Sequence, residues 1–428
     1  MLFLFKIPPL SRLLYNFFIR LYPLIIRFLS PFNPKARQWR RGRKDLFTLL
    51  NNRVAPTDNT IWMHCASLGE FEQGRPLLEK LKSENEGYKI VLTFFSPSGF
   101  EVRKDYEGAD VICYLPMDSR GNAKRFFDLV HPSLILFVKY EFWYYYLAEA
   151  YKRKVPLLLV SGVFREDQPF FRWYGGLHRK MLKAFTHFFI QNADSAELLE
   201  LLGFKDNVTV SGDTRFDRVL QIAATVRDIP QISSFCNGAE VVVAGSTWGE
   251  DDEEMAHFVN SGAAIKFIIA PHDIGKDRLN ECSRLYKKSM LYSAFIAADG
   301  KAGENINTLI IDNIGMLSSL YQYATVAYVG GGFGDDGVHN VLEAAVYGKP
   351  VLFGPVYQKF VEAGELVACG GAFPVKNALE LEKLLTKLLA RDHQYILASH
   401  AAANYVMGKK GPTEAIAAYI YENRLLTS

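Results

Sequence analysis

From Ile61 onward the chain alternates short apolar runs with longer amphipathic stretches. Apolar runs of this length are typical of parallel strands that are covered on both faces, and the stretches between them are long enough for helices. Strict alternation of the two predicts an α/β sheet of parallel strands. A first series of strands is expected at residues 61–67, 89–96, 110–116, 134–140, 156–162, 187–192 and 208–214.

A second series of apolar runs predicts a second sheet of the same kind, with strands at 240–247, 264–271, 308–312, 326–332 and 350–355. The two series join near residues 216–238, where we interpret the sequence RDIPQISSFCNG as a linker. The fold class is therefore α/β, with two Rossmann-like, doubly wound domains that face a cleft. We place these domains at 35–220 and 221–405, with a C-terminal helix at 406–428.

The first 34 residues form a separate segment that is rich in Leu, Phe and Ile. At 100° per residue, Arg12, Arg20 and Arg27 fall within an arc of roughly 80° and leave the rest of the circumference apolar. This pattern predicts an amphipathic helix, bent or interrupted near Pro23, that associates with a membrane surface. A first helix packed on its own domain and a membrane-spanning helix are the alternatives. No apolar run reaches the about 18 residues that spanning requires, and no signal-peptide cleavage site follows.

Charge is distributed unevenly along the chain. Residues 1–44 contain ten Lys or Arg and no Asp or Glu, so the other 384 residues carry about −7 by subtraction from the overall +3. The basic cluster KARQWRRGRK at 35–44 is expected to lie among anionic lipid headgroups. The five cysteines are scattered, which indicates neither a disulfide framework nor a zinc site and fits a reducing, cytoplasmic compartment.

The segment VAYVGGGFGDDGVHNVLEAAVYGKPVLFGP at 326–355 carries the strongest chemical signal. A strand ends in three glycines, and a helix is expected from His339 to Tyr347, so free N–H groups at the helix start would bind an anion such as a nucleotide phosphate. Asn340 and Glu343 share one helical face, where Asn340 would hold phosphate and Glu343 would accept hydrogen bonds from ribose. In the alternative, the glycines serve only the turn and Glu343 is solvated.

This segment and several others resemble the family of 3-deoxy-manno-octulosonic acid (Kdo) transferases, which have the two-domain GT-B fold. The further matching blocks, between about residues 35 and 370, are HCASLGEFEQGRPLLEKL, SGDTRFD, AGSTWGEDDEE and DNIGML. The resemblance implies an inverting transferase that moves Kdo from CMP-Kdo to a lipid A precursor in lipopolysaccharide core biosynthesis. The first domain would then bind the acceptor and the second the CMP-sugar.

The resemblance also implies a location and a set of partners. The enzyme would be anchored by its N-terminal segment at the cytoplasmic face of the bacterial inner membrane, with CMP-Kdo, the lipid A precursor and the membrane surface as partners. No metal, cofactor or nucleic acid is expected.

Three catalytic residues are implied by the matching motifs. Glu70 occupies the general-base position of A-S-x-G-E, and because it lies in the first turn of a helix, we expect its carboxylate to be ionised at neutral pH. Glu141 in KYEFW and Arg215 in DTRFD occupy positions that stabilise the transition state. Arg215 replaces a lysine of the family pattern, and the two are not equivalent. Either Glu141 or Arg215 is structural in the alternative interpretation.

The resemblance assigns further residues to the two substrates. Ser67, Gly69 and Arg165 belong to the acceptor side, where GVFRED replaces the family's R-x-S-E-R and leaves Arg165 as a phosphate contact. On the donor side, His272 follows Pro271 where the family pattern is P-R-H-P, so the arginine contact is missing; a lone histidine is equally often structural. The remaining expected donor-binding residues are Ile314, Gly315, Met316, Gly331, Gly332, Asn340, Val341, Leu342 and Glu343.

Two other functions fit the same sequence. A GT-B UDP-sugar transferase or UDP-sugar epimerase would use the same glycine-rich segment and ribose-binding glutamate. A catalytically inert, membrane-bound lipid-binding protein would keep both sheets and the basic N-terminal segment.

Overall fold

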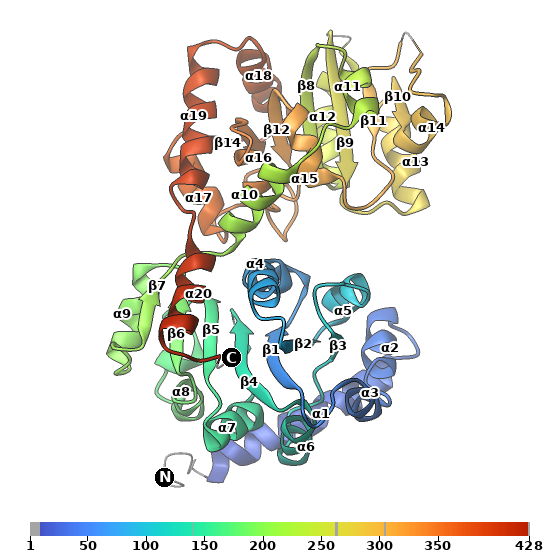
Figure 1. Ribbon diagram of the computed structural model, residues 1–428. Helices are drawn as coiled ribbons and strands as arrows, with labels where there is room; N and C mark the ends of the chain where they lie inside the picture. The colour runs from blue at the N-terminus through green and yellow to red at the C-terminus, as the bar shows by residue number, and fades with distance from the viewer. Residues whose placement is uncertain (1–8, 140, 262–263, 304, 427–428) are drawn as a thin grey trace. The chain divides into compact units, whose positions relative to one another are not determined.

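The computed structural model describes residues 9–139, 141–261, 264–303 and 305–426 (Figure 1). Residues 1–8 of the expected membrane-associating segment and Tyr140 of the KYEFW motif lie outside this range. The chain forms two compact units. Unit 1 contains residues up to Arg218 together with those from Gly411, and unit 2 contains Val219–Lys410.

Unit 1 is built on a seven-stranded parallel sheet with the order β3-β2-β1-β4-β5-β6-β7. All seven strands expected from the sequence are present, each within a few residues of its expected range. Their bounds are β1 Asn59–Cys65, β2 Tyr88–Phe94, β3 Val111–Tyr114, β4 Pro132–Val138, β5 Leu157–Gly162, β6 His187–Ile190 and β7 Val208–Val210.

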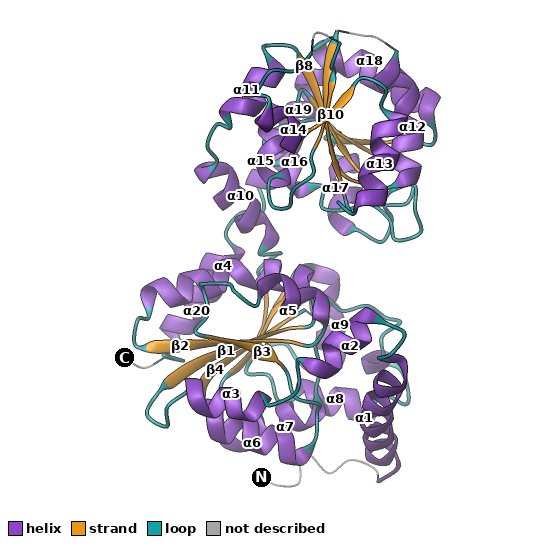
Figure 2. Cartoon of the chain, turned by 90° about the vertical axis from the view of Figure 1, so that its right-hand side faces the viewer, coloured by secondary structure: helices purple, strands orange, loops and turns teal. Residues whose placement is uncertain are grey.

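Helices cover both faces of this sheet (Figure 2). Helices α4 and α20 pack on one face, and α3, α6, α7 and α8 on the other. The helices of unit 1 are α1 Pro9–Leu29, α2 Pro34–Arg41, α3 Leu46–Arg53, α4 Leu68–Glu84, α5 Pro97–Arg103, α6 Arg120–Val130, α7 Tyr144–Arg153, the 3-10 turn Pro169–Phe171, α8 Gly176–Leu182, α9 Ala193–Leu201 and α20 Pro412–Glu422.

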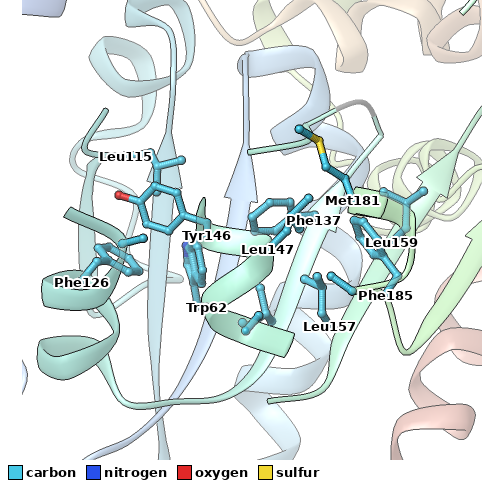
Figure 3. Packing of buried hydrophobic residues seen from close by; sticks show 14 of the residues in the cluster. Trp62, Leu115, Phe126, Phe137, Tyr146, Leu147, Leu157, Leu159, Met181 and Phe185 are labelled. Atoms are coloured by element: carbon cyan, nitrogen blue, oxygen red, sulfur yellow. The ribbon is translucent and has the colours of Figure 1, made fainter. Parts of the chain in front are cut away.

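The core of unit 1 follows from the two-residue period of its strands. Successive side chains of β1 point to opposite faces, so Trp62 packs on one side of the sheet while Ile61 and Met63 pack on the other. Trp62 is fully buried, with its ring centroid 4.7 Å from Phe126 and 5.3 Å from Phe137 (Figure 3). Because both faces are covered, the strands read as continuous apolar runs in the sequence.

Unit 2 contains a second seven-stranded parallel sheet, with the order β10-β11-β9-β8-β12-β13-β14. The five strands expected from the sequence are present. The edge strands β10 and β14 were not expected, because they are largely half-buried, unlike the fully buried β11 and β13 of the same length, and show no continuous apolar run. The bounds are β8 Glu240–Thr247, β9 Ile265–Pro271, β10 Ser289–Leu291, β11 Thr308–Ile310, β12 Val326–Val329, β13 Val351–Phe353 and β14 Ala372–Pro374.

The segment that we interpreted as a linker is largely helical. Residues Pro230–Cys236 form α11, and its Ile232 and Phe235 are buried. Phe235 contacts Phe295 with ring centroids 5.8 Å apart. The linker interpretation was wrong here, because Pro230 stands at the first helical position, where proline is tolerated, rather than in a loop. The passage between the units lies instead within α10, Arg215–Thr225.

The other helices of unit 2 lie between the strands or after the last one. Their bounds are α12 Gly249–Asn260, α13 Lys276–Leu285, α14 Tyr292–Ala297, α15 Leu317–Leu320, the 3-10 turn Tyr321–Tyr323, α16 Leu342–Ala345, α17 Val361–Ala368, α18 Ala378–Leu389 and α19 His393–Met407.

Helix α1 continues through Pro23, so of the bend or interruption that the sequence predicted there, the interruption is absent. One side packs on unit 1: Ile19 is buried, and the Tyr15 hydroxyl donates to Asp118 at 2.5 Å. The opposite side exposes a row of large apolar side chains, among them Phe17 and Phe28, which are 65% and 76% exposed. Within the described residues, no helix combines the length and apolar character needed to cross a bilayer.

Candidate functional site

The carboxyl ends of β1 and β4 mark the position of the site in unit 1. These two strands are neighbours in the sheet, and the strand order runs outward from them in both directions, so a topological switch point lies between them. Ligands of open α/β sheets bind at the carboxyl ends of the strands that flank such a point. Glu70 follows β1 and Glu141 follows β4, so both expected catalytic carboxylates lie beside this switch point.

Glu70 lies in the first turn of α4 and is almost completely buried, with 8% of the residue exposed. Its Oε2 accepts a hydrogen bond from the backbone N–H of Ala66, at the end of the preceding strand. Burial and the negative charge of Glu141 raise the Glu70 pKa to about 7, although the hydrogen bond from Ala66 and the charge of Lys139 oppose the shift.

The expectation of a fully ionised carboxylate at position 70 was therefore wrong. The favourable helix N-terminus is present, but desolvation of the charged form outweighs it. At neutral pH the group is divided between its charged and neutral forms, so it can both accept and return a proton.

Glu141 lies within hydrogen-bond distance of two ring nitrogens from neighbouring elements. Its Oε2 lies 2.5 Å from the indole Nε1 of Trp143 and 3.2 Å from Nε2 of the buried His64. The other ring nitrogen of His64, Nδ1, lies 2.9 Å from the hydroxyl of Thr93, which accepts from the Trp62 indole at 2.8 Å.

The tautomer of His64 decides how this network is hydrogen-bonded. With the proton on Nε2, Thr93 accepts from Trp62 and donates to Nδ1 of His64, and the histidine donates to Glu141. With the proton on Nδ1, His64 donates to the Thr93 carbonyl at 3.2 Å and accepts from Trp143 at Nε2, 3.3 Å away. Its role was not recognised from the sequence, because the partners Thr93 and Glu141 lie 29 and 77 residues away along the chain.

Arg215 is joined to the same helix as Glu70 through a buried carboxylate. Its Nε and Nη2 donate to Asp213 at 2.8 and 2.7 Å, and Asp213 also accepts from Gln73, one turn after Glu70 on α4, at 3.1 Å. Burial alone would raise the Asp213 pKa, but the charge and hydrogen bonds of Arg215 outweigh it, and the pKa is lowered. Asp213 therefore stays ionised and fixes Arg215 relative to α4.

The acceptor-side candidates differ in their surroundings. Ser67 is the N-cap of α4 but makes no side-chain capping bond, and a methyl group added at Gly69 would meet nothing within 4 Å. The first turn of α4 thus has open space beside it. Arg165 is exposed in the loop after β5, where its backbone N–H donates to Gln168 at 3.1 Å.

In unit 2 the switch point lies between β8 and β12, and the glycine-rich turn follows β12. Gly331 has a φ of +91°, and a Cβ atom there would lie 2.5 Å from the carbonyl oxygen of Gly337. A Cβ atom at Gly332 would lie 2.6 Å from the backbone nitrogen of Gly354. Only glycine permits these close approaches of backbone to backbone.

The helix after this turn is shorter than the sequence suggested. Instead of running from His339 to Tyr347, α16 extends only from Leu342 to Ala345, and Gly348 follows with a φ of +63°. The first residues of the expected helix are engaged in other contacts: the His339 N–H donates to the carbonyl of Gly330 at 3.0 Å. A single helical turn has a weaker dipole than the expected helix, so side chains carry more of the binding.

Asn340 and Glu343 do lie together, as expected. The side-chain amide of Asn340 donates to Glu343 at 2.9 Å, and its oxygen accepts from the backbone N–H of Leu342 at 3.2 Å. Val341 is fully buried beside them. In the loop before α15, Ile314 is 85% exposed and Gly315 has a φ of +99°, while Met316 accepts from Asn313 at 3.0 Å.

A stack of three rings stands at the carboxyl ends of β8, β9 and β12. The ring of His272, which follows Pro271 at the end of β9, lies 4.6 Å from Trp248 and 4.5 Å from His339, with interplanar angles of 24° and 15°. Trp248 donates from Nε1 to Nε2 of His339 at 3.0 Å, so His339 carries its own proton on Nδ1. Burial and the neighbouring His272 lower the His339 pKa to about 4.

Asp251 supports this arrangement from the first turn of α12. Its Oδ2 accepts from the backbone N–H groups of Trp248 and Gly331, at 2.9 and 2.8 Å, and its Oδ1 accepts from the Tyr328 hydroxyl at 2.7 Å. Trp248 and Asp251 both belong to the AGSTWGEDDEE block, but their positioning roles were not recognised. The capping-box spacing of these two residues was the available signal.

The sequence is similar to proteins of one known family. A family profile described as 3-deoxy-D-manno-octulosonic-acid transferase matches residues 38–218, which include Glu70, Glu141 and Arg215. A 3-deoxy-D-manno-octulosonic acid transferase from Aquifex aeolicus is 30% identical over 337 residues, which cover 77% of this chain and 86% of that protein. The chain belongs to the Kdo transferase family. A family relative from Bordetella pertussis is 27% identical and covers 92% of this chain and 96% of its own length.

Solved structures confirm the GT-B fold. The MurG protein of Acinetobacter baumannii matches with a TM-score of 0.53 and 12% identity, covering 85% of this chain and 99% of that protein. The UDP-GlcNAc 2-epimerase of Methanocaldococcus jannaschii matches with a TM-score of 0.51 and 16% identity. The match covers 78% of this chain and 93% of that protein. At such low identity these matches establish the architecture alone.

Proposed function

We propose that the protein is an inverting glycosyltransferase that moves Kdo from CMP-Kdo to a sugar hydroxyl of a lipid A precursor, with Glu70 as the general base. The observation that carries this assignment is the environment of Glu70. A buried carboxyl group with a pKa of about 7, held by the Ala66 N–H in the family motif A-S-x-G-E, suits proton removal near neutral pH. Membership in the Kdo transferase family supports the substrates.

In the proposed reaction, Glu70 takes the proton of the acceptor hydroxyl as that oxygen attacks the anomeric carbon of Kdo. The bond from this carbon to the phosphate oxygen breaks, and CMP leaves with the bonding electron pair. The open space beside Gly69 supports an approach of the acceptor to the first turn of α4. Glu141, oriented by His64 and Trp143, lies close enough for its charge to act on Glu70 and thus tunes the base.

Arg215 supplies the positive charge on this side of the reaction. Asp213 holds its Nε and Nη2, and we propose that this fixed guanidinium binds the anionic groups of the donor, its carboxylate or its phosphate. This arrangement supports a role in stabilising the negative charge that develops on the leaving CMP.

Unit 2 is proposed to bind the CMP portion. Glu343 would accept from the ribose hydroxyls, with Asn340 beside it, and the turn at Gly331 and Gly332 allows a phosphate to approach the backbone closely. His272 and the neutral His339 would complete the phosphate site, the latter through its Nδ1–H. The expected contacts at Ile314, Gly315 and Met316 remain proposals of the same kind.

A membrane-surface location is proposed on the basis of α1. Its exposed side carries Phe17, Leu24 and Phe28, and its arginines lie along one edge of this apolar surface. The N-terminal segment would thus attach the enzyme at the cytoplasmic face of the inner membrane, where its lipid acceptor is found.

The direct test is incubation of the purified protein with CMP-Kdo and a lipid A precursor, followed by mass spectrometry of the lipid. We expect a mass increase of one or more Kdo residues. Isothermal titration should show tight CMP binding and negligible UDP binding. The reverse preference would support a UDP-sugar enzyme instead.

The substitution Glu70→Gln tests the general base. We expect the transfer rate to fall by about 10²–10⁴-fold, the usual range for loss of a general base, with CMP affinity unchanged. Glu72→Gln is the matched control, because Glu72 lies on the same helix but pairs with Arg103 at 2.6 Å. An E70Q variant that still modifies the lipid at the wild-type rate would contradict the assignment.

A further inference from the structure

An open pocket of about 610 Å³ lies in unit 1 between α1, α2, α3 and the connection from β3 to α6. Four of its twelve lining residues are arginines, namely Arg20, Arg27, Arg40 and Arg43, and none of the twelve is acidic. The lining therefore carries a formal charge of +4 that no carboxylate of the lining balances. None of the twelve lining residues has a role in the reaction proposed above.

The arginines of the pocket are not neutralised by neighbouring side chains. Among the described residues, none of the four forms an ion pair; Arg40 donates to the Ser30 hydroxyl at 3.0 Å, and Arg43 donates to the carbonyls of Leu115, Trp39 and Phe95. Asp118, beside the lining residue Met117, is buried and already accepts from the Tyr15 hydroxyl. The positive charges of the pocket therefore remain uncompensated.

Arg43 is the most buried of the four arginines. Its guanidinium lies 3.8 Å from the ring centroid of Trp39, and burial lowers its pKa to about 9. A buried guanidinium that faces only carbonyl oxygens and rings gains much from a nearby anion, because hydrogen bonds between charged groups are about twice as strong as neutral ones.

Trp39 provides a second, independent sign of a ligand. The residue is 95% buried and lines the pocket, and its indole Nε1 is a buried donor with no acceptor within hydrogen-bond distance among the described residues. Buried donors of this kind are rare in folded proteins, because leaving one unsatisfied costs about 1–3 kcal/mol. Trp39 thus combines a place in the lining of the pocket with an unsatisfied donor.

The apolar surface of α1 borders the pocket and indicates what carries the anion. Leu24 lines the pocket and is 61% exposed, and at 100° per residue it lies on the helix between the pocket residue Arg20 and the exposed Phe28. A free phosphate ion has no apolar groups that could pack against such a border. A phosphate joined to acyl chains would place its charge among the arginines and its chains along α1.

We propose that this pocket binds the phosphate of an anionic membrane phospholipid, with the acyl chains lying along the exposed apolar side of α1. Arg20, Arg27 and Arg40 surround the phosphate at the pocket mouth, and Arg43 and the Trp39 indole lie deeper. The proposal goes beyond the diffuse attraction of a basic segment to a membrane, because it assigns one lipid to one site.

Such a lipid would lie next to the network around Glu141. Arg43 donates to the carbonyl of Phe95 at 2.8 Å, and the Phe95 ring packs 4.7 Å from Trp143, which donates to Glu141. Tyr22 of α1 also contacts Phe95, at 5.8 Å between ring centroids. A bound headgroup would therefore keep the membrane surface next to Glu141 and the neighbouring Glu70.

Isothermal titration of the full-length protein with dihexanoyl phosphatidylglycerol, kept below its micelle concentration, tests the proposal. We expect saturable binding of one lipid per chain. Dihexanoyl phosphatidylcholine, which has the same chains but no net charge, should bind at least tenfold more weakly, and so should glycerol phosphate, which has no chains. Equal binding of phosphatidylcholine would overturn the role of the arginines, and equal binding of glycerol phosphate would overturn the lipid assignment.

Two double variants separate the pocket from diffuse charge. Arg20→Gln with Arg27→Gln should weaken phosphatidylglycerol binding at least tenfold, whereas Arg12→Gln with Arg41→Gln removes the same charge from exposed positions outside the pocket and should change it less than threefold. Equal weakening by both pairs would overturn the proposal. The titration contains neither donor nor acceptor sugar, so its outcome is independent of the proposed transferase activity.

Discussion

Two carboxyl groups with different surroundings share the site of unit 1. Glu141 accepts from the Trp143 indole and lies within hydrogen-bond distance of His64, whereas Glu70 is more deeply buried and has a single backbone donor as its closest hydrogen-bond partner. Many enzymes that use acid–base catalysis have two acidic residues whose different environments give them different pKa values. Here the more buried member is the proposed base, and its pKa is about 7.

The pH dependence of transfer should report this pKa. Glu70 must be deprotonated to act as a base, so kcat/KM should rise with pH through an apparent pKa of about 7 and then level off. In the Glu141→Gln variant the like charge is absent, so the midpoint of this rise should move to lower pH. Glu149→Gln, which alters an acid on α7 that pairs with Arg153, should leave the midpoint in place. A midpoint that does not move in E141Q would contradict the coupling.

Glu70 should also lower the stability of unit 1 at alkaline pH. Its pKa in the folded protein is about 7 against an ordinary value of 4.5, so the folded state binds its proton more tightly than the unfolded state. The protonated carboxyl group therefore contributes fully to the stability of unit 1 below pH 4.5, and this stabilisation is lost as the pH rises through 7. Glutamine does not ionise, so no charge is buried at this position at high pH. At pH 8 the Glu70→Gln variant should therefore be more stable in unit 1 than the wild type by on the order of 3 kcal/mol, measured by chemical denaturation. No gain at pH 8 relative to pH 5 would show that the carboxyl is not desolvated.

At the level of elements, the turn after β12 depends on close contacts between backbone segments. Gly331→Ala would place a methyl group against the carbonyl of Gly337 at a positive φ, which costs about 1–2 kcal/mol before the clash is counted. We expect a lower melting temperature of unit 2 and at least a tenfold loss of CMP affinity, measured by calorimetry and titration.

Gly364→Ala is the matched control for this substitution. Gly364 lies within α17, and an added methyl group there meets nothing within 4 Å. Stability should be unchanged or slightly raised, since alanine favours helices. If both alanines were tolerated equally, the turn would not be the constrained element that its geometry indicates.

At the scale of the whole molecule, the chain passes between the units twice, near residues 218 and 410. Asp217 joins the two passages within unit 1: its carboxylate accepts from the backbone N–H groups of Gly411 and Thr413, both at 2.7 Å. These N–H groups belong to the start of α20, so Asp217 acts as the cap of a helix almost 200 residues further along the chain.

Loss of this cap should loosen α20. Asp217→Ala should lower the stability of unit 1 by about 1–2 kcal/mol and speed tryptic cleavage at Lys409 and Lys410, as followed by mass spectrometry. Asp206→Ala, at an exposed position in the same unit, should cleave at the wild-type rate. Unchanged cleavage in D217A would show that packing of Ile416 and Ile420 alone holds the helix.

The sequence by itself determined most strands of both sheets and the family, and it predicted the residues that we propose to have chemical roles. The strands were recognisable because parallel strands covered on both faces consist of continuous apolar residues, as in β1 and β4, and the motif around Glu70 is contiguous along the chain. The half-buried edge strand β10 and the short helix α11 were missed, because neither shows a continuous apolar run or a helical period over several turns.

Only the tertiary structure decided how these residues act. The order of the strands brings Glu70 and Glu141 to one switch point, and no local pattern encodes that order. The pKa of Glu70 depends on desolvation and on a charge that is distant in the sequence, so the local helix start predicted the wrong protonation state. The link from His64 to Glu141, the ring stack at Trp248 and the capping of α20 by Asp217 are likewise long-range contacts that exist only once the chain has folded.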